Sequence, residues 1–219
     1  MLNEKAREVL KEELKNHYKY RETGYTDEEF EKEALEKYKS VLGPVPARYK
    51  HITKDSLSQE MHDKLMPGED KNGLYIWGGV GSGKTATLYS IKDRFARAGK
   101  RFRVINMTEL LYEIKNSFNQ EAPPLDIVEE GAYYTAFDDL GTEKDSEWAG
   151  EQVYRLVNSI YENKKNFAFT SNFSLKELAG RYGDHGDRIA SRIAEMAEVI
   201  EVKGTDRTGH FKRTPIRLS

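Results

Sequence analysis

Eight consecutive residues have the order of a phosphate-binding loop, G-x-x-x-x-G-K-[ST], and they are Gly78-Gly79-Val80-Gly81-Ser82-Gly83-Lys84-Thr85. The glycines let the backbone curl so that successive N–H groups point inward around a phosphate. A helix that begins near Lys84 would add its positive dipole end at the same point. We expect Lys84 to reach the β- and γ-phosphates of ATP and the Thr85 hydroxyl to hold Mg²⁺. The segment is therefore predicted to bind ATP together with Mg²⁺.

Two adjacent carboxylates, Asp138 and Asp139, follow the apolar run at residues 133–137. A strand that carries an acid at its carboxyl end is the Walker B arrangement, in which Asp138 is the magnesium-side acid. Hydrolysis also needs a group that orients and deprotonates the attacking water. Asp139 is the candidate for that role, and Glu143 is the reserve choice. Together with the phosphate loop, these acids predict an ATPase.

The elements that must position these residues alternate along the chain. Short apolar runs at 74–77, 102–105, 133–137, 167–170 and 199–202 alternate with helical patterns at 84–98, 108–118, 147–163, 174–179 and 187–196. This alternation predicts an α/β fold with a parallel five-stranded sheet sandwiched by helices, in which ligands bind at the carboxyl ends of the strands. Asn106, which ends the second run, is interpreted as a cap at the end of a strand; the alternative is a relay between the ligand and the active site.

Composition excludes several classes of protein. The 219 residues include no cysteine, which rules out disulfide frameworks, thiolate zinc sites and cysteine nucleophiles. No apolar stretch is long enough to span a membrane, and the charged N-terminal residues do not resemble a signal peptide. We therefore expect a cytoplasmic protein with no membrane association. A net charge of −2 argues against a wholesale basic nucleic-acid binder, although local patches are possible.

Three regions are predicted along the chain: a helical segment at 1–43, an ATPase core at 44–202 and a basic tail at 203–219. The first contains an amphipathic pattern from Leu2 and a second one from Thr26 that starts with a capping box. It is either a helical hairpin packed on the core or a docking module for another protein. Only 17 residues follow Val202, too few for a C-terminal helical lid.

Several further motifs resemble the DnaC/DnaI-type helicase loaders and their IstB relatives, over roughly residues 44–210. The similar segments are residues 45–49 before the core, 138–144 around the acids, 169–178 after the fourth strand, the arginine box at 187–193 and the arginine motif at 204–207. The resemblance implies an AAA+ type P-loop NTPase without a helical lid. It also implies ATP-dependent self-association. Some loaders carry a zinc-binding N-terminal domain, which the absence of cysteine excludes here.

The resemblance assigns roles to three more residues. Asn172 would be the sensor that bonds the attacking water or the γ-phosphate, and Arg192 would be an arginine finger that reaches the ATP of a neighbouring subunit. Arg207 would be a second sensor that contacts phosphate in its own subunit. The alternative for Arg192 is a surface arginine paired with Glu195. Many AAA+ proteins have Glu where this chain has Asp139, which bears on the hydrolysis rate more than on ATP binding.

The resulting hypothesis is a replicative DNA helicase loader that hydrolyses ATP slowly, with stimulation by its partner or by DNA. It would bind the hexameric helicase through the N-terminal helices and single-stranded DNA through the core. The basic tail, and Lys100 to Arg103 with Phe102 between the charges, are possible DNA contacts or simply solvated basic edges. The alternatives are an IstB-like ATPase that assists a transposase, a P-loop small-molecule kinase, and a nucleotide-gated adaptor that does not hydrolyse ATP.

Overall fold

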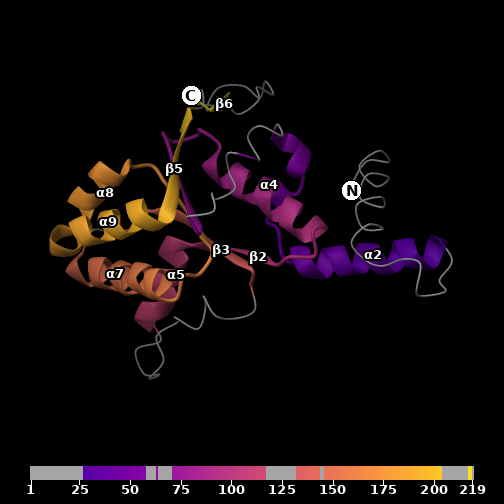
Figure 1. Cartoon of the computed structure of the whole chain (residues 1–219), viewed down its shortest axis with the longest axis horizontal. Coiled ribbons are helices and arrows are strands. Elements are labelled where there is room, and N and C mark those ends of the chain that lie inside the picture. Colours follow the sequence, from indigo (N-terminus) through magenta and orange to yellow (C-terminus); the bar gives the residue numbers. More distant parts are fainter. Residues whose placement is uncertain are drawn as a thin grey trace.

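The computed structural model describes residues 27–57, 63, 71–116, 132–143, 146–203 and 217–218. Its centre is one sheet with the strand order β2-β3-β4-β1-β5-β6 (Figure 1). The parallel strands are β1 (Gly73–Trp77), β2 (Phe102–Asn106), β3 (Tyr134–Leu140), β4 (Phe167–Ser171) and β5 (Ala197–Lys203). The predicted α/β fold with five parallel strands is confirmed. A short strand, β6 (Arg217–Leu218), adds an antiparallel pairing to β5 that the sequence pattern did not indicate.

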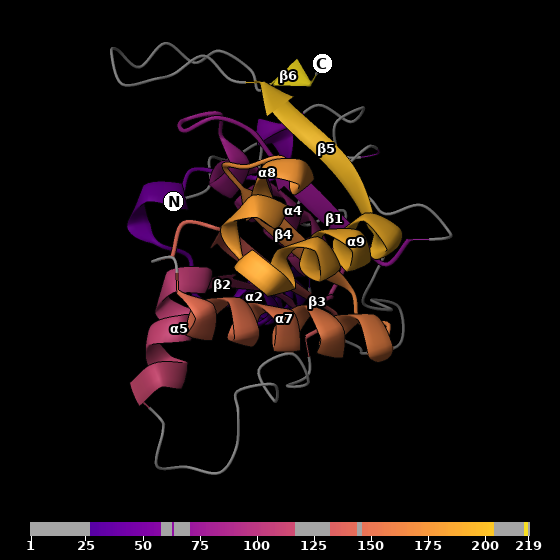
Figure 2. The ribbon, with the colours of Figure 1, turned by 90° about the vertical axis from the view of Figure 1, so that its left-hand side faces the viewer.

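Helices cover both faces of the sheet. They are α2 (Asp27–Leu42), α4 (Lys84–Arg97), α5 (Met107–Asn116), α7 (Glu147–Glu162), α8 (Leu175–Arg181) and α9 (Gly186–Met196). Short 3₁₀ turns lie at Ala47–Tyr49 (η2), Lys54–Ser56 (η3) and Gly183–His185 (η4). In Figure 1, α2 and α4 lie on one side of the strands, and α5, α7, α8 and α9 lie on the other; the second group faces the viewer in Figure 2.

Two separate cores follow from the alternation of side chains along the strands. In β1, Leu74 and Ile76 pack into a core with Leu88 of α4. Tyr75 lies between them in sequence and belongs to the opposite core, together with Val153 of α7. Successive strand residues point to opposite faces, so a strand with buried residues on both sides needs helices on both sides.

Polar side chains begin three of the helices. The Ser146 hydroxyl accepts from the Ala149 N–H at 3.2 Å, and Ser174 forms a capping box with Glu177 before α8. The Asn106 Oδ1 accepts from the Thr108 and Glu109 N–H groups in the first turn of α5, at 3.0 and 3.2 Å. The interpretation of Asn106 as a cap is therefore confirmed, and its bonds also fix the start of the helix that follows β2.

Helix α2 packs on α4 through its apolar face, where Ala34 and Tyr38 are each 5% exposed. Beneath it, the buried Asp93 carboxylate accepts from the Tyr38 hydroxyl and, at 2.8 Å, from both the Lys54 N–H and the Arg97 Nε. The apolar face of α2 is thus used within the chain, and its outer face carries exposed charged side chains. The predicted first helix and the Thr26 capping box lie outside the described residues.

Beyond β5, only the two residues of β6 are described. The predicted basic tail, the arginine motif with Arg207, and the predicted absence of a lid therefore fall mainly on residues outside the description. In the part of the chain that the structure covers, no helix is both long and apolar enough to cross a membrane.

Candidate functional site

The order of the strands brings the predicted site residues to one edge of the sheet. Strand β4 lies between β3 and β1, and the phosphate loop follows Trp77 at the carboxyl end of β1. Asp138 lies near the carboxyl end of β3, and Asn172 comes directly after β4. Since parallel strands end at the same edge, the three elements meet where ligands of open α/β sheets bind.

The phosphate loop depends on glycine for its shape. Gly78, Gly81 and Gly83 have φ values of 155°, 78° and 100°, which side-chain-bearing residues rarely adopt. A Cβ on Gly78 would also lie 2.2 Å from the Val202 carbonyl oxygen of β5. Both constraints hold the loop close to the sheet. Val80 at its tip is 76% exposed.

Lys84 lies across the inside of the loop and is 5% exposed. Its Nζ donates to the carbonyl oxygens of Gly78 and Gly79 at 2.8 and 2.9 Å. Burial lowers the pKa of Lys84, while the charges of Asp139 and Asp138 oppose that shift. The ammonium group therefore lies where the loop backbone and two carboxylates converge.

Thr85 and Asp138 form the proposed metal-binding pair. The Thr85 hydroxyl donates to the two carboxylate oxygens of Asp138 at 3.0 and 3.2 Å. Thr170 of β4 donates to the same carboxylate from the other side. Burial raises the pKa of Asp138, against the effect of the threonine hydrogen bonds. A hydroxyl and a carboxylate this close are hard oxygen ligands of the kind Mg²⁺ prefers, so the residues present fit the ion.

Asp139 has an unusual backbone for a residue other than glycine, with φ at 63°. Its N–H donates to the Thr170 hydroxyl at 2.9 Å, so one threonine orders both adjacent acids. The Asp139 side chain is half-buried, in contrast to Asp138, which is 6% exposed. Strained backbone conformations of this kind cluster at functional sites.

Glu143, the reserve choice for the water-activating acid, is committed to contacts within the protein. It is 5% exposed, and its Oε2 accepts from the Gly141 N–H at 3.0 Å. Its Oε1 accepts from the hydroxyl of Tyr182, at the end of α8. Burial and Glu143 together raise the pKa of Tyr182, so its hydroxyl keeps the proton that it donates. These contacts favour Asp139 over Glu143 as the acid that faces water.

Arg192 lies apart from the phosphate site of its own chain. The Cζ of its guanidinium is 4.8 Å from the ring centroid of Tyr154 and 5.6 Å from that of Tyr161, both on α7. Glu195, the alternative partner, accepts instead from the Tyr161 hydroxyl at 2.7 Å.

Asn172 is half-buried beside the carboxyl edge of the sheet. Arg207 lies outside the described residues.

The structure changes the interpretation of the segment from Lys100 to Arg103, which was considered for DNA contact. Phe102 is 2% exposed and packs against Phe95 and Tyr134, so it cannot stack on a nucleic-acid base. The exposed aromatic residue at this place is Tyr133, which is 48% exposed and has the Lys100 Nζ 4.3 Å from its ring centroid.

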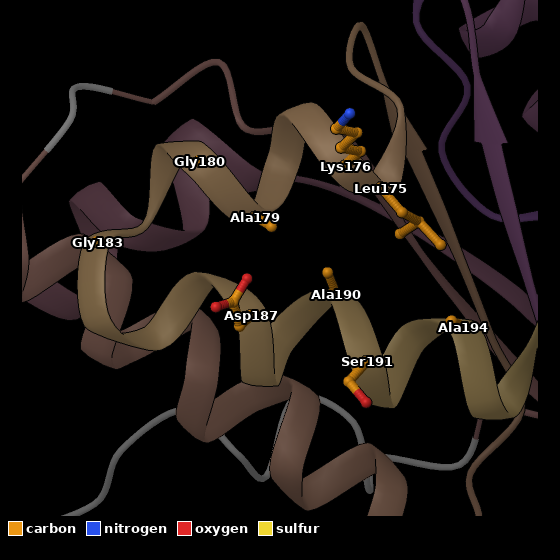
Figure 3. A pocket seen from close by; sticks show the side chains of 9 residues that line it. All are labelled: Leu175, Lys176, Ala179, Gly180, Gly183, Asp187, Ala190, Ser191 and Ala194. Carbon is orange, nitrogen blue, oxygen red and sulfur yellow. The ribbon is translucent and has the colours of Figure 1, made fainter.

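A groove of about 590 Å³ lies between α8 and α9, as Figure 3 shows. Its walls include the small residues Ala179 and Ala190, with Lys176 and Asp187 among the charged residues that line it. No residue of the phosphate loop lines it. This groove is therefore separate from the nucleotide site, and it lies on another side of the helix that carries Arg192.

The chain is similar in sequence to two kinds of replication protein. It is 28% identical over 143 residues to the chromosomal replication initiator protein DnaA of Borrelia duttonii, covering 61% of this chain and 27% of that protein. It is 28% identical over 148 residues to the replicative helicase loader DnaI of Bacillus subtilis, covering 62% of this chain and 47% of DnaI. The chain thus spans about a quarter to a half of the length of these curated relatives. No protein-family model matches it.

Solved structures show the same fold. The DnaI crystal structure has a TM-score of 0.62 at 23% identity and covers 74% of this chain and 94% of that chain. The crystal structure of the DnaC helicase loader has a TM-score of 0.60 at 22% identity and covers 72% of this chain and 100% of that chain. The resemblance to DnaC/DnaI-type loaders is confirmed. DnaA bound to AMPPCP and single-stranded DNA shares the fold as well, with a TM-score of 0.56 at 15% identity, covering 73% of this chain and 51% of that chain.

Within this fold, the sequence interpretation missed three kinds of contact. Thr170 holds both acids, and its only sequence signal is a hydroxyl near the end of an apolar strand. The Tyr182 hydroxyl donates to the Glu143 carboxylate, and no local sequence pattern indicated this hydrogen bond. Tyr154 and Tyr161 lie one above the other on α7, where their spacing of seven residues indicates only a shared helix face.

Proposed function

We propose that this protein binds and hydrolyses ATP and acts as a replicative DNA helicase loader. The contact between the Thr85 hydroxyl and the Asp138 carboxylate, at 3.0 Å, carries the first part of this proposal. It joins the end of the phosphate loop to the acid of β3, so one magnesium-bound nucleotide could be held by both elements. The AMPPCP-bound DnaA neighbour supports nucleotide binding in a fold of this type.

In this proposal the residues of the loop, Gly78 to Thr85, wrap the phosphates, and Lys84 balances their charge. Thr85 and Asp138 would hold Mg²⁺, which supplies positive charge against the phosphate oxygens when it is bound. Asp139 would orient the attacking water and accept its proton. Asn172 would hydrogen-bond the same water or the γ-phosphate, and Arg207 would contact phosphate within its own subunit.

Arg192 would act on the nucleotide of a second copy. Helix α9 ends beside the amino edge of the sheet, because the Asn72 N–H donates to the Met196 carbonyl at 3.2 Å. The phosphate loop begins at the other end of β1, and a strand of five residues spans about 16 Å. Arg192 is four residues before Met196, so its location favours a role in trans over one in its own site. ATP-dependent self-association would then complete the catalytic site.

The proposed partners are a hexameric replicative helicase and single-stranded DNA. DnaI and DnaC are named as helicase loaders, and one DnaA neighbour is bound to single-stranded DNA. The helicase would dock on the N-terminal segment, where the outer face of α2 exposes charged side chains such as Glu33, Glu36 and Lys37. An IstB-like role beside a transposase would use the same ATP site and differ only in the partner.

The test combines the purified protein with the host's hexameric helicase and single-stranded DNA, with and without ATP. We expect a complex of all three components that requires ATP, together with phosphate release stimulated by DNA or helicase. Lys84→Ala should lose ATP binding and the ATP-dependent complex. If wild-type protein hydrolyses ATP but forms no complex with the helicase under any condition, the loader assignment is wrong and the ATPase assignment stands.

A further inference from the structure

The guanidinium of Arg192 lies against two tyrosine rings of α7 rather than against an acid. Its distances from the ring centroids of Tyr154 and Tyr161, 4.8 and 5.6 Å, are within the range of cation–π attraction. Both tyrosines are half-buried where α7 packs against α9. We call the two tyrosines and the space between them and α9 the Arg192 cage.

Polar side chains of α9 contact both tyrosines of the cage. The Tyr161 hydroxyl donates to Glu195 Oε1 at 2.7 Å, which ties this ring to the helix that carries Arg192. Arg192 and the exposed Arg188 both lower the pKa of Tyr154, the hydrogen bond from Arg192 being the larger cause. Arg188, Arg192 and Glu195, whose charges act on these two tyrosines, all lie on α9.

Arg192 nevertheless keeps one unused donor. Its Nη1 is buried and has no hydrogen-bond partner among the described residues. Buried polar groups in folded proteins nearly always have a partner, and an unpaired one raises the free energy of the state that contains it. The contacts with the rings orient the guanidinium, but they leave its hydrogen-bonding capacity incomplete within the chain.

We infer that Tyr154 and Tyr161 are positioning residues that order Arg192 for a phosphate oxyanion of a second copy. This inference rests on the proposed role of Arg192 in trans. A free arginine side chain samples many rotamers and loses that freedom when it binds. Two aromatic faces restrict the guanidinium before the second copy arrives. Arg192 as a whole is only half-buried, so part of its side chain remains accessible to an oxyanion of that copy. The ring contacts carry this role, and the Tyr154 hydroxyl, which accepts a hydrogen bond from Arg192, supports it.

The test uses two variants that are inactive alone and share one composite site when mixed. Lys84→Ala cannot bind ATP but can donate Arg192, and Arg192→Ala binds ATP but lacks the finger. Mixing the two should restore phosphate release. The substitutions Tyr154→Leu and Tyr161→Leu are then placed together, first in the Lys84→Ala copy and then in the Arg192→Ala copy.

We expect the leucine pair to reduce the restored rate at least about tenfold in the copy that donates Arg192, and to leave it nearly unchanged in the copy that binds ATP. The corresponding phenylalanine pair should retain most of the rate in either copy. General damage to the fold would act in both copies, so the second placement is the control for folding.

Two results would overturn the inference in distinguishable ways. If Lys84→Ala and Arg192→Ala restore no activity when mixed, the role of Arg192 in trans fails and the inference fails with it. If they restore activity and the leucine pair in the donor copy has no effect, or has the same effect in both copies, the tyrosines do not position Arg192 and the proposed function is untouched.

Discussion

The phosphate site and the Arg192 cage differ in the partners of their charged side chains, which are polar groups in the first and aromatic rings in the second. In the phosphate site, Asp138 accepts from two threonines, and Lys84 donates to two carbonyl oxygens of the loop. In the cage, Arg192 lies against two aromatic rings, and one of its nitrogens has no acceptor among the described residues.

This difference indicates how each region is used. Charges with polar partners inside the chain hold a loop in the shape that a ligand needs before the ligand binds. A guanidinium supported by rings is held in place without an acid of its own chain, so its charge remains available to an acceptor from elsewhere. We therefore regard the phosphate site as organised within one copy and the cage as one half of a site between copies.

The largest expected effect is that of Arg192→Ala on ATP hydrolysis. An arginine that stabilises charge in phosphoryl transfer contributes about 10³-fold or more, so we expect a loss of that order in the rate of phosphate release. ATP affinity should change little, because Arg192 lies away from its own phosphate loop. Arg155→Ala is the control, since Arg155 is exposed on α7 and pairs with Glu151 of the same helix, at 2.6 Å. Equal rates of phosphate release for Arg192→Ala and Arg155→Ala would contradict the assignment of Arg192 to a site between copies.

The next effect separates the two candidate acids after β3. Asp139→Asn should lower hydrolysis about 10²-fold or more while ATP still binds, because the amide cannot take the proton of the attacking water. Asparagine tolerates the left-handed backbone of this position, so the substitution adds little strain. Glu143→Gln should keep hydrolysis within a few-fold of wild type. The opposite order of rates would restore Glu143 as the water-activating acid.

A third prediction concerns a tyrosine that acts through its hydroxyl, in contrast to the ring contacts of the Arg192 cage. Tyr182→Phe removes the donor to the buried Glu143 carboxylate and should lower the free energy of unfolding by about 1–3 kcal/mol. Urea denaturation measures this change. Tyr112→Phe is the matched control, because Tyr112 is 69% exposed and its hydroxyl faces solvent. A loss of stability as large for Tyr112→Phe would show that the Glu143 contact is not the cause.

The smallest effect concerns the pH dependence of Asp138. Its pKa is raised by burial, so the folded chain holds this proton more tightly than the unfolded chain does. Stability should therefore fall as pH rises from the ordinary aspartate range through the raised pKa. In EDTA, Asp138→Asn should increase the unfolding temperature by a few degrees at pH 8 and by less at pH 5. A gain that is equal at both pH values, or larger at pH 5, would rule out the burial of this charge as its origin.

The parts of the fold and site that sequence reasoning anticipated are those with local patterns. Alternating apolar runs and helical patterns indicated the five parallel strands, and the residues of the phosphate loop are contiguous. Lys84 contacts Gly78, only six positions away, so its contact follows from the loop itself. The approach of Asp138 to Thr85 required the further assumption that strand ends meet at one edge.

The sequence by itself thus determined the phosphate loop, the two acids and the class of fold, because each depends on neighbours within one element or on strand alternation. Three contacts were decided by the tertiary structure alone. Thr170 hydrogen-bonds both acids, and the Tyr182 hydroxyl donates to Glu143. The rings of Tyr154 and Tyr161 support Arg192. The hydrogen bonds among these join residues 31, 32 and 39 positions apart. Such contacts depend on strand order and on helix packing against the sheet, which place distant segments side by side, and no local spacing encodes that placement.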